Sequence, residues 1–105
     1  MGKSSTSGNI VVNAPTDGEK ISSPYTITGS ARVFENTANY ELKDDSGQVL
    51  ASGMVNALAT DVGQFGNFTT PFSFTTSAKA GTLSVFDYSA KDGSKQDVVE
   101  IKVNF

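Results

Sequence analysis

Residues 81–105 read GTLSVFDYSAKDGSKQDVVEIKVNF, and this stretch decides the fold. Thr82–Ala90 and Val98–Phe105 are both rich in β-branched and aromatic residues, which favour strands. Lys91–Ser94 between them contains Asp-Gly, a dipeptide that favours chain reversal. The stretch therefore predicts a β-hairpin around which the earlier strands pack. In its second strand one set of residues is expected in the core and the alternate set in water: Val99, Ile101, Val103 and Phe105 against Val98, Glu100, Lys102 and Asn104.

The first strand of this hairpin has an interrupted alternation. Leu83 and Val85 share one face, but Asp87 falls on that face two residues later, while Phe86 and Tyr88 take the other. Two arrangements account for this pattern. Either a β-bulge near Phe86 exchanges the faces, or Asp87 lies at the wet end of the strand and Phe86 and Tyr88 are covered from outside.

The composition indicates one small β-rich domain. The chain has 105 residues, enough for one domain and too few for two ordinary ones. Leu, Ile, Val and Phe make up 25 of them, which is enough to form a core. Ser and Thr number 24 and Gly 10, and long helix-forming runs are missing, so strands and turns are expected.

Charge and residue types exclude several classes of function. The net charge is −3 with both signs scattered, so there is no basic stripe for a nucleic acid. No apolar run approaches membrane-spanning length. The chain contains no Cys, which excludes disulfides and thiolate catalysis, and no His, the commonest general base and metal ligand.

Turn residues divide the rest of the chain into five further predicted strands, at residues 9–14, 25–34, 38–44, 48–57 and 67–76. With the hairpin they make about seven short strands, which an all-β, immunoglobulin-like, two-sheet antiparallel sandwich buries best. Pro71 cannot donate a ladder hydrogen bond, so its strand is expected at an edge or at a bulge. Gly53 predicts a bulge or bend in the strand 48–57.

The domain is expected to span residues 9–105. Residues 1–8, MGKSSTSG, are small and polar, and we expect a flexible tag or linker there. They contain no signal peptide, so an exported protein would have lost its leader.

Several stretches resemble the immunoglobulin-like domain of bacterial spore germination proteins. The most specific are Gly81–Phe86 and Tyr88–Ser94, followed by Ile101–Val103 and Phe105. The others, in chain order, are Ile10–Val12 with Pro15 and Gly18, Ile21–Pro24, Gly29–Glu35 and Asp44–Leu50. The resemblance covers roughly residues 9–105 and is loose between Gly53 and Asn67.

The resemblance implies an extracytoplasmic module of a bacterial envelope or spore-associated protein: secreted, held in the cell envelope or anchored as a lipoprotein. Modules of this kind often sit beside another domain. The family has no agreed catalytic residues, so the resemblance transfers none, and no cofactor is expected.

Acidic residues are candidates for catalysis or metal binding, but a role in turns explains them more simply. Glu35, Asp44, Asp45 and Asp87 could supply a carboxylate pair. Calcium could bind Asp44 with Asp45, or Asp87 with Asp92, but neither pair has the spacing of a known calcium loop. Turns select Asp on their own account. We therefore expect solvated turn acids, no enzyme and no metal site.

Four aromatic residues are hard to place on the inward faces: Phe34, Phe65, Phe86 and Tyr88. Together in the open they would form a docking patch for protein or a stacking platform for sugar rings. Alternatively, Phe34 and Phe65 cap the ends of the sandwich and Phe86 packs under a loop. The sequence leaves both arrangements open.

A second set of residues is expected to be structural. Pro24 leads into a strand, Gly29 gives room in a central strand, Glu35 follows a strand at a sheet corner, and Asp92 and Gly93 form the hairpin turn. Two functions are compatible with this domain. The first is a non-catalytic module that docks on a neighbouring domain or an envelope protein, and the alternative is a module that binds peptidoglycan or another envelope glycan.

Overall fold

The computed structural model describes residues 5–33, 37–58, 64–89 and 91–105. Within them the chain forms nine strands and no helix. The strands are β1 (Ser5–Ser7), β2 (Ile10–Ala14), β3 (Glu19–Lys20), β4 (Tyr25–Ala31), β5 (Thr37–Asp44), β6 (Val49–Asn56), β7 (Gly66–Phe72), β8 (Ala80–Tyr88) and β9 (Lys95–Asn104).

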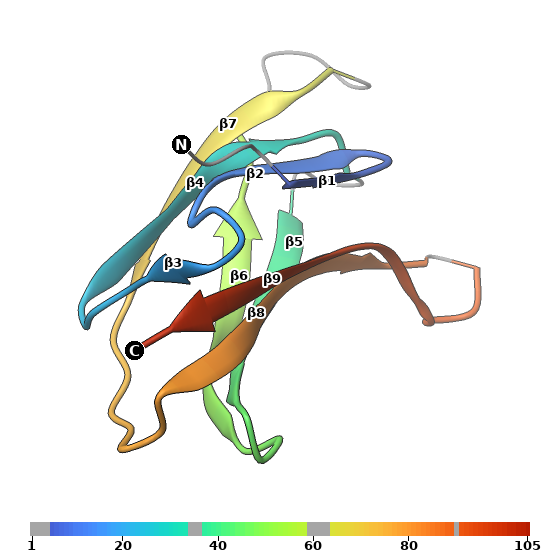
Figure 1. Ribbon diagram of the computed structural model, residues 1–105. Coiled ribbons are helices and arrows are strands. Elements are labelled where there is room, and N and C mark those ends of the chain that lie inside the picture. Colours follow the sequence, from blue (N-terminus) through green and yellow to red (C-terminus); the bar gives the residue numbers. More distant parts are fainter. Residues whose placement is uncertain (1–4, 34–36, 59–63, 90) are drawn as a thin grey trace.

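The strands make two sheets that pack face to face (Figure 1). One sheet has the order β1-β2-β4-β7 and the other the order β3-β9-β8-β5-β6. Every pairing is antiparallel except that of β3 with β9. The expected two-sheet sandwich is thus confirmed. It holds two more strands than the seven predicted, because β1 and β3 are too short to give a period in the sequence.

The predicted hairpin is present as β8 and β9, which project beyond the other strands of their sheet (Figure 1). Val99, Ile101 and Val103 are buried while Glu100 and Lys102 are exposed, as the alternation indicates. Val85 pairs with Val99, but Asp87 pairs with Gln96, so the register shifts by one residue.

The shift is a β-bulge in β9. Phe86 alone lies opposite Asp97 and Val98, and Asp97 has a left-handed φ of 52°. A bulge is therefore present near Phe86, but it does not exchange the faces of β8, and Phe86 is covered on the outer side as the second arrangement indicates. The extra residue of the bulge belongs to β9, so β8 keeps its alternation and Asp87 stays on the inner side, 8% exposed.

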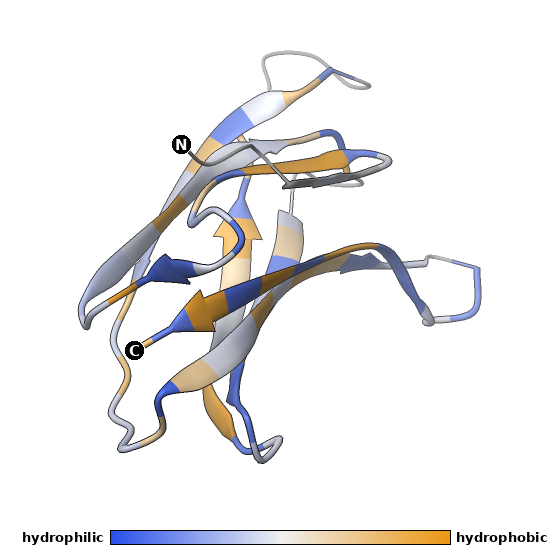
Figure 2. Cartoon of the chain, in the orientation of Figure 1, coloured by the Kyte–Doolittle hydropathy of each residue, from blue (hydrophilic) through white to orange (hydrophobic). Residues whose placement is uncertain are grey.

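The core lies between the sheets and draws inward residues from both. Apolar and polar segments alternate along the C-terminal part of β9 (Figure 2), as expected for a strand with one face in the core and one in water. The largest fully buried side chains are Phe68, Ile10, Ile27, Leu42, Leu83 and Ile101.

Three expectations about single segments have different outcomes. Pro71 lies in β7, which is an edge strand as predicted. A bulge or bend is expected at Gly53, but the register shift of this strand lies at Leu50, because Lys43 pairs with Val49 and Leu42 with Ala51. Residues 5–7 differ from the flexible linker expected over 1–8, because their backbone pairs with β2 as strand β1.

Polar contacts of Glu19 hold the turn that leads into β3. Its carboxylate accepts hydrogen bonds from the Thr16 N–H at 2.9 Å and the Tyr25 hydroxyl at 2.9 Å. The bond from Thr16 is the main reason that the pKa of Glu19 lies below its usual value. Burial, helped by the negative partner, raises the pKa of Tyr25 to about 12.

Candidate functional site

The two outer faces of the sandwich differ in chemistry. On the four-stranded sheet, the outward positions of β4 are the hydroxyl residues Thr26, Thr28 and Ser30, and those of β7 are Asn67, Thr69 and Pro71. On the five-stranded sheet, outward positions carry charges of both signs and exposed apolar side chains. We therefore take the second surface, called here the outer face, as the candidate site.

Strand register arranges the charges of the outer face in two rows across β8. Thr82 lies between Lys43 of β5 and Lys102 of β9. Two residues further along, the second row consists of Ser84 between Glu41 and Glu100. Residues two apart in a strand are about 7 Å apart, so a lysine row and a glutamate row lie side by side at that spacing.

A hollow of about 750 Å³ lies over these rows. Gly81 and the short side chains of Thr82 and Ser84 contribute to its lining, and the longer charged side chains of β5 and β9 flank them. Asp44 and Asp45 line it beside Lys43, and Phe86 lines it beyond Ser84. The hollow therefore follows β8 from an acidic end to an aromatic end.

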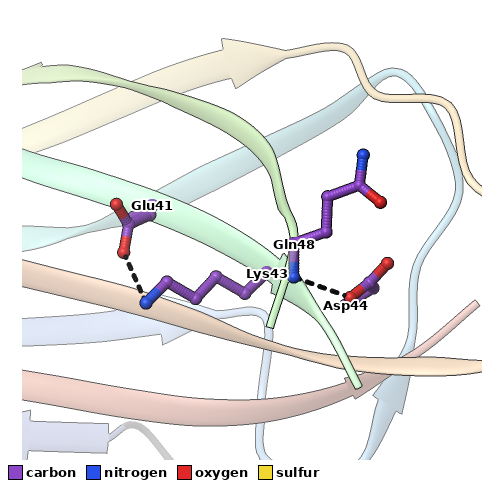
Figure 3. Close-up of polar contacts among 4 residues, drawn as sticks. All are labelled: Glu41, Lys43, Asp44 and Gln48. Atoms are coloured by element: carbon purple, nitrogen blue, oxygen red, sulfur yellow. Dashed lines mark hydrogen bonds and ion pairs between the residues drawn. The ribbon is translucent and has the colours of Figure 1, made fainter. Parts of the chain in front are cut away.

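One ion pair spans the two rows. Lys43 Nζ lies 3.4 Å from Glu41 Oε1, both on β5 (Figure 3). The two side chains are 46% and 24% exposed. An ion pair this open contributes at most about 1 kcal/mol, so both charges can turn to another partner at little cost.

Phe86 forms the aromatic end of the hollow, and its own ring is nearly covered. It is 3% exposed. The Tyr88 ring packs against it edge to face, with centroids 5.4 Å apart and planes at 87°, and Lys95 Nζ lies 4.4 Å from its centroid. Tyr88 itself is 48% exposed. The two rings therefore offer no coplanar platform on which a sugar could stack.

Exposed apolar side chains surround Phe86. Met54 is 60% exposed and Val98 37%. Met54 lies across Asn39 from Phe86, and these three residues line a second hollow of about 290 Å³ that also reaches Tyr88. Four apolar or aromatic side chains thus form a patch beside the glutamate row. We call these residues, Met54, Phe86, Tyr88 and Val98, the Phe86 patch.

The Phe86 patch continues to a free sheet edge, because β6 is the last strand of its sheet. The segment Val49–Asn56 contains neither a charged residue nor a proline. Edge strands are usually protected by such residues against pairing with another chain. Among the described residues, the bulge at Leu50 is the feature of β6 that gives such protection.

The four aromatic residues singled out in the sequence do not form one cluster in the described structure. Phe86 and Tyr88 lie together on β8. Phe65 precedes β7 of the other sheet, is 45% exposed, and lies under the guanidinium of Arg32, 5.1 Å from its ring centroid. Phe34, like Glu35, lies outside the described residues. A role for these residues in binding stays a prediction.

The described residues expected to be structural occupy turns and one tight contact. A cis peptide bond joins Ser23 to the exposed Pro24, just before β4. Gly29 is buried in β4, where a Cβ atom would collide with the Val11 carbonyl oxygen and lie 2.7 Å from the Phe68 ring. Gly93 has a left-handed φ of 77° in the β8–β9 turn.

Two aspartates close hairpin turns in the same way. Asp44 accepts hydrogen bonds from the hydroxyl and the N–H of Ser46. It also accepts one from the N–H of Gln48 (Figure 3). Asp92 accepts bonds from the hydroxyl and the N–H of Ser94. These bonds, led by the Ser46 hydroxyl for Asp44 and by the Ser94 N–H for Asp92, lower the pKa of both carboxyls. Both carboxylates thus have a structural use.

The outer face presents groups that can make several kinds of contact with a partner molecule. In the described ranges no three His, Cys, Asp or Glu side chains come close enough to hold a metal ion, and no helix has the length and hydrophobicity needed to cross a membrane. The outer face instead combines charges, hydroxyls and apolar groups. Sequence reasoning placed Glu100 and Lys102 outward, but it missed their alignment with Glu41 and Lys43, which only strand register creates.

Comparison with known proteins gives one match. A family described as the immunoglobulin-like domain of bacterial spore germination matches residues 9–94. No curated protein and no solved structure matches the chain. The matched part runs from the start of β2 to the β8–β9 turn, so it includes Phe86 and Tyr88 but not the charged positions of β9.

Proposed function

Because the chain belongs to the family of immunoglobulin-like domains of bacterial spore germination, we propose that it is a non-catalytic, extracytoplasmic module that docks on a protein. The partner is a neighbouring domain or another protein of the envelope or spore. The docking surface is the outer face, centred on the Phe86 patch and continuing to the β6 edge.

One observation carries this proposal: three exposed apolar side chains of the five-stranded sheet, Met54, Tyr88 and Val98, gather around a ring that is itself covered. Met54 and Tyr88 are 60% and 48% exposed, while Phe86 beneath them is 3% exposed. Contiguous apolar groups rimmed by charges are typical of protein interfaces. A sugar-binding face would instead present open, coplanar rings, and the 87° between Phe86 and Tyr88 does not provide them. The geometry therefore favours protein over glycan.

The β6 edge supports the same proposal through the backbone. An uncharged edge strand of eight residues can accept an extended segment of a partner by β-augmentation. Met54 belongs both to this strand and to the Phe86 patch. A partner strand paired with β6 would therefore also reach the apolar side chains of the outer face.

A binding experiment with one envelope fraction, treated in three different ways, tests the proposal. The purified chain is immobilised and offered a solubilised envelope fraction of a spore-forming bacterium, untreated, digested with proteinase or digested with muramidase. We expect binding to be lost after proteinase and kept after muramidase. Tyr88→Ala and Met54→Ser should weaken it, whereas Thr28→Ala on the opposite face should not. Binding that survives proteinase, fails after muramidase and needs Tyr88 would establish the glycan alternative instead.

A further inference from the structure

The lysine row places one cationic side chain on each side of β8. Lys43 and Lys102 flank Thr82 on the neighbouring strands, so their backbones are about 10 Å apart. Their flexible side chains can close on a carboxylate placed between them, and the Thr82 hydroxyl can donate to the same group. The short Thr82 side chain in the lining of the hollow leaves room for it.

The glutamate row offers the opposite preference at the next position. Glu41 and Glu100 flank Ser84 in the same way. Carboxylates on both sides and a hydroxyl oxygen below suit an ammonium or guanidinium group. The outer face therefore has an anion position and a cation position about 7 Å apart along β8.

A third position follows at the same step. Phe86 lies two residues beyond Ser84 in β8, and the other residues of the Phe86 patch lie around it. The order along β8 is thus lysine row, glutamate row and apolar patch. Side chains on one face of any extended strand recur with this same spacing of about 7 Å, so a strand aligned with β8 keeps its register across all three positions.

We propose that the outer face binds an extended strand of its partner. The side chains of that strand that face β8 are acidic, basic and apolar, in this order, at alternate positions. This inference rests on the proposed docking function and specifies the partner's chemistry. The ion pair between Lys43 and Glu41 opens on binding, and each charge then faces the opposite charge of the partner. A lysine row beside a glutamate row selects its partner, because a partner strand with its two charges exchanged meets like charges at both positions.

Two blocked peptides, TETKTLT and TKTETLT, are the probes, each also made with the reverse sequence because the strand direction is open. They differ only in the order of their charges. Titration into the isotope-labelled chain is followed by amide NMR shifts. We expect the acid–base–apolar order to shift amides of Thr82, Ser84 and Phe86 and to bind at least about fivefold more tightly than the exchanged order.

A charge-exchange variant provides the matched control. Glu41→Lys, Lys43→Glu, Glu100→Lys and Lys102→Glu together exchange the two rows without changing the net charge. The variant should prefer TKTETLT, while its circular dichroism spectrum stays that of the parent. Equal affinities of the parent for the two orders, no shifts on the outer face at millimolar peptide, or an unchanged preference in the variant would each overturn the inference.

Two further arms separate this inference from other outcomes. Shifts of the same amides by chitohexaose but not by the peptides would assign the hollow to a glycan and overturn it. Proteinase-sensitive binding of envelope material that the charge-exchange variant retains in full would overturn it too, while leaving the proposed docking function intact. Loss of the docking function would show instead in the envelope experiment, which does not depend on the peptides.

Discussion

At the scale of the residue, small and short polar side chains fix the backbone. Asp44 and Asp92 each close a turn by accepting bonds from groups two residues ahead. This is the local use of Asp that turn sequences predict. Gly29 serves differently, because the space that a side chain would need is filled by the neighbouring strands.

The turn aspartates predict an acid-sensitive component of stability. Their pKa values are lower in the folded chain than in the unfolded chain, so they stabilise the fold above about pH 4, the ordinary Asp value, and lose this contribution as pH falls through the lower folded values. Urea midpoints measured from pH 7 to pH 2 should fall most steeply below pH 4. Asp44→Ala should reduce this dependence more than Asp45→Ala, which removes the same charge but leaves the bonds of Asp44. Equal curves for both variants would contradict the assignment.

Gly29→Ala should destabilise the domain by about 1–3 kcal/mol, because the added methyl group overpacks a buried site. It would strike the Val11 carbonyl oxygen and crowd Phe68. Thermal unfolding should show a fall in Tm of roughly 4–8 °C per kcal/mol. Ser30→Ala, at the next, outward position of β4, should change stability by less than about 0.5 kcal/mol. A Gly29→Ala variant as stable as the parent would refute this packing.

At the scale of the element, one bulge shapes the long hairpin. Asp97 is the residue with left-handed φ, and its carboxylate accepts a hydrogen bond from the Asn9 side chain at 3.3 Å. The bulge shifts the register so that Gln96 pairs with Asp87 and Lys95 with Tyr88. The shift places Lys95 on the outer face, over Phe86.

Asp97→Val should destabilise the hairpin by about 1–2 kcal/mol, because a β-branched residue resists left-handed φ. Asp97→Gly should cost less than Asp97→Val, since glycine adopts this conformation freely although the bond from Asn9 is lost. Chemical denaturation of the two variants checks the order. If the valine variant proves as stable as the glycine variant, the bulge is not where the register puts it.

At the scale of the whole molecule, one core couples two sheets whose outer faces are free to differ. The outward side chains of β4 in the four-stranded sheet carry hydroxyl groups. The outward surface of the five-stranded sheet, the outer face, carries charges and the Phe86 patch. Side chains that bind a partner can therefore lie together on one sheet, while the shared core holds both sheets in place.

The core is small enough for one aromatic ring to matter to the whole domain. Phe68→Ala removes a ring that is 1% exposed and should cost about 3–5 kcal/mol, a large part of the roughly 5–10 kcal/mol expected for a domain of this size. The Tm should fall by more than about 10 °C. Phe65→Ala is the control of the same residue type, and since that ring is 45% exposed the cost should stay below about 1 kcal/mol. Similar losses for both would contradict a core centred on the buried ring.

The sequence alone determined which residues lie inward along a regularly alternating strand such as β9. Val99, Ile101 and Val103 lie inward as their alternation predicts, because a strand turns alternate side chains to opposite faces whatever its neighbours are. The hairpin and the edge position of Pro71 were predictable for the same local reason, the backbone preferences of Asp-Gly and of proline.

The tertiary structure decided everything that depends on register between strands. No property of Lys43 or Lys102 in the sequence shows that Thr82 will lie between them. The bulge at Asp97 and the short strand β3 likewise exist only through their partners. A strand's period fixes which face a side chain joins, but its neighbours across that face are set by hydrogen bonds to distant segments, and the candidate site is made of such neighbours.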